Sequence, residues 1–228
     1  MLAFVWEILV SFIYAAVYVS VMIEVERRGP LSKDEFVRVK RLLHKQGKFV
    51  KTKARFTLMY FRDFIPKDMK EIEAEKVDLR LRVTGKKPEI VLKYGLFKAD
   101  NPREEVILPF ALEHVEEAVD LLKYLGWTLG VIYSTKAYVY THKNIEFALV
   151  EIVGYGFMYE AEICVGIKKN VAAAQKKISI ACDKLGLHEY VDGEFDRQCN
   201  AINNKRDLQV DFSRDTFKKI RARFKEFF

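Results

Sequence analysis

Cysteine and histidine are scarce in this sequence, and neither is arranged as a metal site. Cys164, Cys182 and Cys199 are odd in number and widely separated, and the four histidines are equally dispersed. Zinc sites need closely spaced ligands of this kind, and disulfide-stabilised secreted domains carry an even cysteine set. The sequence therefore predicts neither a zinc site nor a disulfide framework. It favours reduced, buried thiols in a cytoplasmic protein.

A stretch with charge of only one sign is also missing. The 228 residues carry a formal net charge of +7, but acidic and basic residues are interleaved along the chain. A nucleic-acid-binding face would show a basic stripe. We therefore expect an anionic partner that is not nucleic acid.

The first residues lack the positive start of a signal peptide. Nevertheless, Met1–Ile23 is apolar except for Glu7 and a few small polar groups, and its length approaches that of a membrane span. The positive-inside rule would place the following Arg27 and Arg28 in the cytoplasm. Three interpretations of residues 1–21 stay open: a membrane anchor, a helix packed on the domain, or a gene-model artefact with translation starting at Met22.

Alternating apolar and polar residues predict many strands and few helices after this segment. Ser32 and Glu35 form a capping box that starts a helix ending at Gly47, and Gly186 is expected to end a helix over 170–185. We expect an α+β fold in which roughly eight antiparallel strands close into a barrel, or tunnel, with helices packed outside. This domain is expected over residues 22–187, with a polar linker and a basic C-terminal helix over 188–228.

One strand, Met22–Arg28, places two carboxylates and a guanidinium on the same face, namely Glu24, Glu26 and Arg28. A lone Glu-x-Glu on a strand usually marks a solvated face. Here, however, a second acidic pair follows at Glu160 and Glu162, and cations lie between the pairs at Arg80, Arg82 and Lys93. Closing the sheet would turn all of them into one lumen. Unpaired buried charges are costly, so such a lumen favours a site for a divalent metal and a polyanion.

The same motifs resemble the CYTH superfamily, the triphosphate tunnel metalloenzymes. Glu24-Val25-Glu26-Arg27-Arg28 is similar to the family's Glu-x-Glu-x-Lys signature. The resemblance continues in family order through 78–82, 91–95, 143–146, 153–157 and 160–163. It implies an antiparallel eight-stranded tunnel, Mg²⁺ or Mn²⁺ as cofactor, and a small molecule bearing a triphosphate as partner.

The resemblance also implies a role for each site residue. Glu24, Glu26, Glu160 and Glu162 would bind the metal. Arg28, Arg80, Arg82, Lys93 and, less securely aligned, Lys136 would bind the triphosphate, with Arg28 and Lys93 taking part in catalysis. Two departures bear on the chemistry: Arg28 replaces the family's Lys, and Val150 stands where an acidic residue is expected. Arginine stays charged, so Arg28 can clamp phosphate but cannot act as a base.

Three functions are consistent with these residues. The leading hypothesis is a triphosphate phosphohydrolase acting on inorganic tripolyphosphate, thiamine triphosphate or a nucleoside triphosphate. The alternatives are a class IV adenylyl cyclase that makes cyclic AMP from ATP, and a binding module without turnover. A homodimer and a membrane contact through residues 1–21 stay open.

Overall fold

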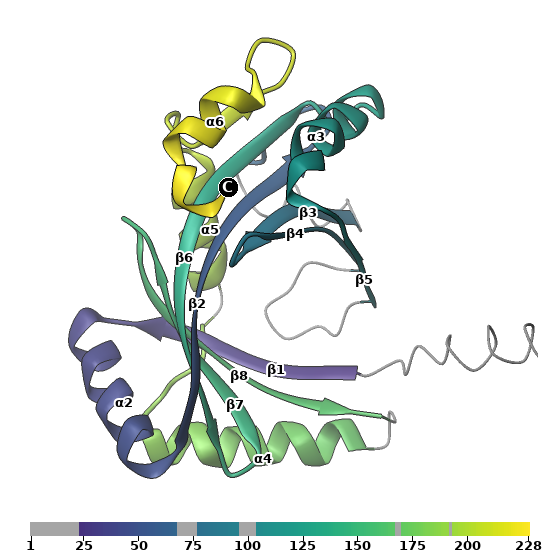
Figure 1. The fold of residues 1–228 in the computed structure, drawn as a ribbon. Coiled ribbons are helices and arrows are strands. Elements are labelled where there is room, and N and C mark those ends of the chain that lie inside the picture. Colours follow the sequence, from purple (N-terminus) through teal and green to yellow (C-terminus); the bar gives the residue numbers. More distant parts are fainter. Residues whose placement is uncertain (1–22, 68–76, 96–103, 167–169, 192) are drawn as a thin grey trace, which may run out of the picture.

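The computed structural model describes residues 23–67, 77–95, 104–166, 170–191 and 193–228 (Figure 1). The apolar segment over residues 1–21 lies outside these ranges, and so does the boundary predicted at residue 22. Among the helices in the described ranges, none combines the length and the apolar character needed to cross a membrane.

Eight antiparallel strands form one curved sheet in the order β1-β8-β7-β6-β2-β3-β4-β5, and a short ninth strand, β9, pairs with β6. The sheet curls into a half-barrel, with β3, β4 and β5 bending back over its concave side (Figure 1). β1 and β5 are its edges, and they do not pair with each other within the described residues. The α+β prediction is therefore confirmed. The strands are β1 (Ile23–Leu31), β2 (Lys48–Phe61), β3 (Val77–Thr84), β4 (Lys87–Tyr94), β5 (Glu104–Pro109), β6 (Leu129–His142), β7 (Ile145–Ile152), β8 (Gly156–Val165) and β9 (Gln209–Asp211).

Helices and short 3₁₀ turns surround this sheet. At the start of α2, Ser32 Oγ accepts a hydrogen bond from the Glu35 amide, and the Glu35 carboxylate accepts one from the Ser32 amide, as the predicted capping box requires. Gly186 ends α4 with a left-handed backbone. The helices are α2 (Lys33–Gln46), α3 (Val115–Tyr124), α4 (Val171–Leu185), α5 (Glu194–Asn203) and α6 (Phe217–Arg223), with 3₁₀ turns at Leu112–His114 and Lys225–Phe227.

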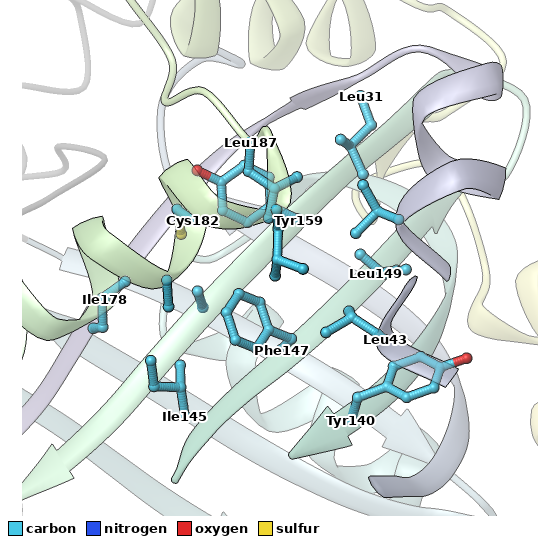
Figure 2. Packing of buried hydrophobic residues seen from close by; sticks show 14 of the residues in the cluster. Leu31, Leu43, Tyr140, Ile145, Phe147, Leu149, Tyr159, Ile178, Cys182 and Leu187 are labelled. Atoms are coloured by element: carbon cyan, nitrogen blue, oxygen red, sulfur yellow. The ribbon is translucent and has the colours of Figure 1, made fainter. Parts of the chain in front are cut away.

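Two apolar cores lie between the convex face of the sheet and the helices. The first packs α2 and α4 against β1, β8 and β7, and Figure 2 shows Phe147 of β7 among side chains such as Ile178 and Cys182 of α4. The second packs α3 and α6 against β2 and β3. Aromatic side chains of α6 and of the residues that follow it are buried there, namely Phe217, Phe224 and Phe227. Burial of these outward side chains leaves the alternate side chains of each strand facing inward.

A third apolar cluster lies on the concave side and joins α5 to the sheet. Met59, Ile152 and Met158 from three strands share one apolar cluster with Ile202 of α5. The segment from residue 188 onward is therefore not a polar linker: it contains α5 and β9, and it closes over part of the concave face. Its polar composition hid this role, because α5 buries only a narrow apolar face.

The three cysteines are unpaired, but only Cys182 is buried. Cys164 is exposed near the end of β8, and Cys199 is half-buried on α5. The prediction of free thiols is confirmed, and the prediction that all three are buried is wrong.

Candidate functional site

The concave face of the sheet encloses a cavity of about 460 Å³. All the predicted site residues except Lys136 line it, although they come from strands far apart in the sequence. Strand alternation explains this convergence, because each of these residues occupies an inward position of its strand. The predicted residues on its wall are Glu24, Glu26, Arg28, Arg80, Arg82, Lys93, Glu160 and Glu162.

Carboxylates gather on one side of the cavity, across β1, β8 and β7. Glu26 lies opposite Glu162 in the β1–β8 register, and Glu162 lies opposite Glu146 in the β8–β7 register. Side chains at opposed positions of neighbouring strands are close, with β-carbons about 5 Å apart. Three carboxylates therefore form a row across three strands, and Glu24 and Glu160 extend it along β1 and β8.

This acidic wall is electrostatically crowded. Burial raises the pKa of Glu162 to about 8, and a hydrogen bond and the charge of Glu24 add to the effect. Burial also raises the pKa of Glu26, against the opposing influence of Arg28. Burial and neighbouring carboxylates thus favour the neutral form of both groups, and for Glu26 the ion pair with Arg28 only partly offsets this effect.

Cations gather on the other side, across β2, β3 and β4. Thr57 of β2 lies opposite Arg82 of β3, and Asp78 of β3 lies opposite Lys93 of β4. The cations of this wall are Lys53, Arg55, Arg80, Arg82 and Lys93. The cavity is thus divided into an acidic side and a basic side.

Arg28 is the one predicted cation on the acidic side. Its guanidinium forms an ion pair with Glu26 and lies 5.4 Å from the ring centre of Phe195 on α5. Burial lowers the pKa of Arg28, but the charges of Glu26 and Glu160 outweigh it and leave the pKa raised. Its Nε is buried and has no hydrogen-bond partner among the described residues. Arg28 is therefore permanently charged and retains a donor directed at no protein atom.

The basic side contains its own counter-ions. Asp78, whose side chain is 4% exposed, accepts two hydrogen bonds of 2.6 Å from Arg80. Arg82 and Lys93 have looser partners: Glu105 Oε1 lies 3.6 Å from Arg82 Nη1 and 3.4 Å from Lys93 Nζ. Burial, together with the positive charges of Arg80 and Arg55, lowers the pKa of Arg82 to about 10.

Lys136 does not belong to the site. It lies on β6 between the inward residues Thr135 and Ala137, so its side chain projects from the opposite face. It is exposed, and its Nζ lies 5.4 Å from the ring centre of Tyr138 on the same outer face. The prediction that Lys136 is a tunnel cation is wrong because its position is one residue out of the inward alternation.

Several residues of the cavity were not predicted as site residues. Helix α5 supplies Phe195, Gln198, Cys199, Ile202 and Asn203, which no sequence motif marked. The acids Glu89, Glu105 and Glu146 and the cations Lys53 and Arg55 also line the wall. Alternation along β2 carried a signal for Arg55, since it shares a face with Thr57 and Met59. No comparable signal marked α5.

The acidic wall fits a divalent ion chemically, because hard cations take carboxylate oxygens and Glu24, Glu26, Glu146, Glu160 and Glu162 line one side of the cavity. The described residues include no preformed group of three or more Asp, Glu, His or Cys side chains arranged to hold a metal.

Solved structures share this architecture, whereas no family model and no curated relative matches the chain. A Pyrococcus horikoshii protein is 23% identical, with coverage of 75% of this chain and 95% of its own and a TM-score of 0.57. A Hippeastrum protein described as an adenylyl cyclase candidate with dominant triphosphatase activity is 16% identical (79% and 96% covered, TM-score 0.55). An adenylate cyclase candidate from Vibrio parahaemolyticus is 14% identical (75% and 96% covered, TM-score 0.53). Identities this low establish the shared fold alone, and this fold agrees with the antiparallel α+β sheet predicted from the sequence.

Proposed function

We propose that the protein is a metal-dependent phosphohydrolase of triphosphate-bearing substrates. One observation carries the proposal: a single cavity has carboxylates on β1, β8 and β7 facing cations on β2, β3 and β4. A triphosphate complexed with a divalent ion carries the complementary pair of charges. An ordinary protein surface would not need to enclose positively and negatively charged side chains in one cavity.

The residues would divide the work by charge. Glu24, Glu26, Glu160 and Glu162 would hold Mg²⁺ or Mn²⁺, which when bound supplies positive charge to the phosphoryl oxygens. Arg80, Arg82 and Lys93 would bind phosphate oxygens and orient the chain of phosphates. Arg28 and Lys93 would stabilise the negative charge that develops as the terminal phosphoryl group is transferred to water.

Two features favour hydrolysis over the alternatives. Arg28 is always positively charged, so it cannot remove a proton from a ribose hydroxyl. It therefore cannot act as the base that cyclisation of ATP needs. The Hippeastrum protein that shares the fold is described as having dominant triphosphatase activity despite its name. Cyclase activity and binding without turnover are the two alternatives that a product assay can distinguish from hydrolysis.

The test is a product assay. The protein is incubated with tripolyphosphate, thiamine triphosphate and ATP, each with Mg²⁺ or Mn²⁺, and orthophosphate and cyclic AMP are both measured. We expect orthophosphate from at least one substrate, and its loss in Glu24→Gln and Arg82→Ala. Cyclic AMP from ATP without orthophosphate would instead establish the cyclase. Tight triphosphate binding without any product would establish the binding module.

A further inference from the structure

We propose that Glu105 is a displaceable counter-ion, which occupies two of the phosphate-binding cations until a polyphosphate takes its place. This inference rests on the proposed function and deepens it, because it assigns an acidic residue of the basic wall a role in setting substrate affinity. Glu105 lies on β5, and Lys93 lies opposite it in the β4–β5 register.

One carboxylate oxygen serves both cations. Glu105 Oε1 lies 3.6 Å from Arg82 Nη1 and 3.4 Å from Lys93 Nζ, so it is placed between two positive groups. A phosphoryl oxygen that bridged the same two cations would need the same space. Glu105 and the substrate therefore cannot both make these contacts, and substrate binding must include the cost of moving the carboxylate away.

The geometry indicates that Glu105 moves easily. Its contacts are longer than charge-assisted hydrogen bonds, which are about 2.7–2.9 Å, and its side chain is 27% exposed. β5 is an edge strand, and within the described residues no strand pairs along its outer side. Rotation of the side chain toward water would thus break no backbone pairing.

Asp78 provides the contrast within the same wall. It makes two hydrogen bonds of 2.6 Å to Arg80, and its side chain is only 4% exposed. Moving it would leave a buried carboxylate without its partner, which costs several kilocalories per mole in proteins. Asp78 therefore holds Arg80 in position permanently, whereas Glu105 can leave Arg82 and Lys93.

The experiment measures binding and not turnover. Isothermal titration calorimetry with the imido analogue of tripolyphosphate, which resists hydrolysis, is run in Mg²⁺ on the full chain and on Glu105→Gln. Glu151→Gln is the charge-matched control, because Glu151 does not line the cavity. Removing one carboxylate close to two cations should tighten binding roughly fivefold to fiftyfold. The control should change affinity less than twofold.

The failures of the two proposals are distinguishable. If the wild-type chain does not bind the analogue, the proposed function and this inference are both overturned. If the wild type binds and Glu105→Gln binds equally well or more weakly, only the counter-ion role of Glu105 is overturned, since a positioning role would weaken binding. Glu105→Ser is measured in parallel, with thermal melts of both variants, so that a folding defect in one does not decide the result.

Discussion

Replacing Glu162 with glutamine should stabilise the metal-free protein while weakening its metal binding. The reason is the crowding of the acidic wall, where burial and the neighbouring Glu24 raise the pKa of Glu162 from 4.5 to about 8. A carboxyl group in this state opposes folding whenever it must be ionised. Glutamine keeps nearly the same shape and cannot ionise, so it removes this cost and also removes one of the proposed metal ligands.

The pH dependence follows from proton linkage. Because the folded-state pKa is the higher of the two, the folded protein keeps its proton between about pH 4.5 and pH 8 while the unfolded chain releases it. The free energy of unfolding therefore falls as pH rises through this window, and the loss is complete above about pH 8. The carboxyl is half-buried and water screens it, so we expect a contribution of roughly 1–2 kcal/mol.

Urea denaturation in EDTA at several pH values from 5 to 8.5 measures the effect. Wild type should lose roughly 1–2 kcal/mol more than Glu162→Gln over this range. Adding Mn²⁺ should raise the melting temperature of wild type more than that of the variant. Glu151→Gln, which lies on β7 but off the cavity, should follow wild type. Identical pH profiles for wild type and Glu162→Gln would refute the account of a crowded acidic wall.

Three further predictions test the site and the fold. Arg82→Ala should lower kcat/KM for the best triphosphate substrate about 100-fold in a steady-state assay, because it removes a buried charge-assisted contact. Lys136→Ala, on the outer face, is the control and should stay within twofold of wild type in the same assay. Ser32→Ala should lower the free energy of unfolding by about 1 kcal/mol in chemical denaturation, since the α2 capping box is lost; an unchanged midpoint would contradict the cap's role. Gly29→Ala should cost at least about 2 kcal/mol by the same measurement, because a Cβ there would overlap the carbonyl oxygen of His188 and the ring of Tyr159; a variant as stable as wild type would show that the segment around His188 yields freely.

Local pattern was sufficient to predict the parts of the site that lie on strands. Side chains of a strand alternate between faces, so Glu24, Glu26 and Arg28 had to share one face once Val25 was buried. The same reasoning placed Arg80 with Arg82. The prediction that Lys136 lines the cavity was wrong because it came from an uncertain alignment with the family and not from the alternation of β6 itself.

The rest of the site depends on contacts between distant segments. The register that places Glu26 opposite Glu162 pairs strands more than a hundred residues apart, whereas Glu162 meets Glu146 across the consecutive strands β7 and β8. Helix α5 lines the cavity because Ile202 belongs to the apolar cluster that includes Met59 and Met158. Its sequence reads as a polar linker because polar residues predominate over 194–203. Glu105 is likewise an ordinary edge-strand acid until the curl of the sheet brings it to Arg82.

On the proposed function, the charge balance of the cavity would make metal binding a condition for substrate binding. The lining carboxylates are Glu24, Glu26, Glu89, Glu105, Glu146, Glu160 and Glu162, and the lining cations are Arg28, Lys53, Arg55, Arg80, Arg82 and Lys93. Even with Glu162 protonated, the two sets only balance, so a triphosphate meets no net positive charge in the metal-free cavity. A divalent ion on the acidic side reverses that balance and leaves the basic side available to phosphate. By linkage, the triphosphate must strengthen metal binding to the same degree. The acids of the basic wall, Glu105 above all, then act against nonproductive binding of anions that arrive without a metal.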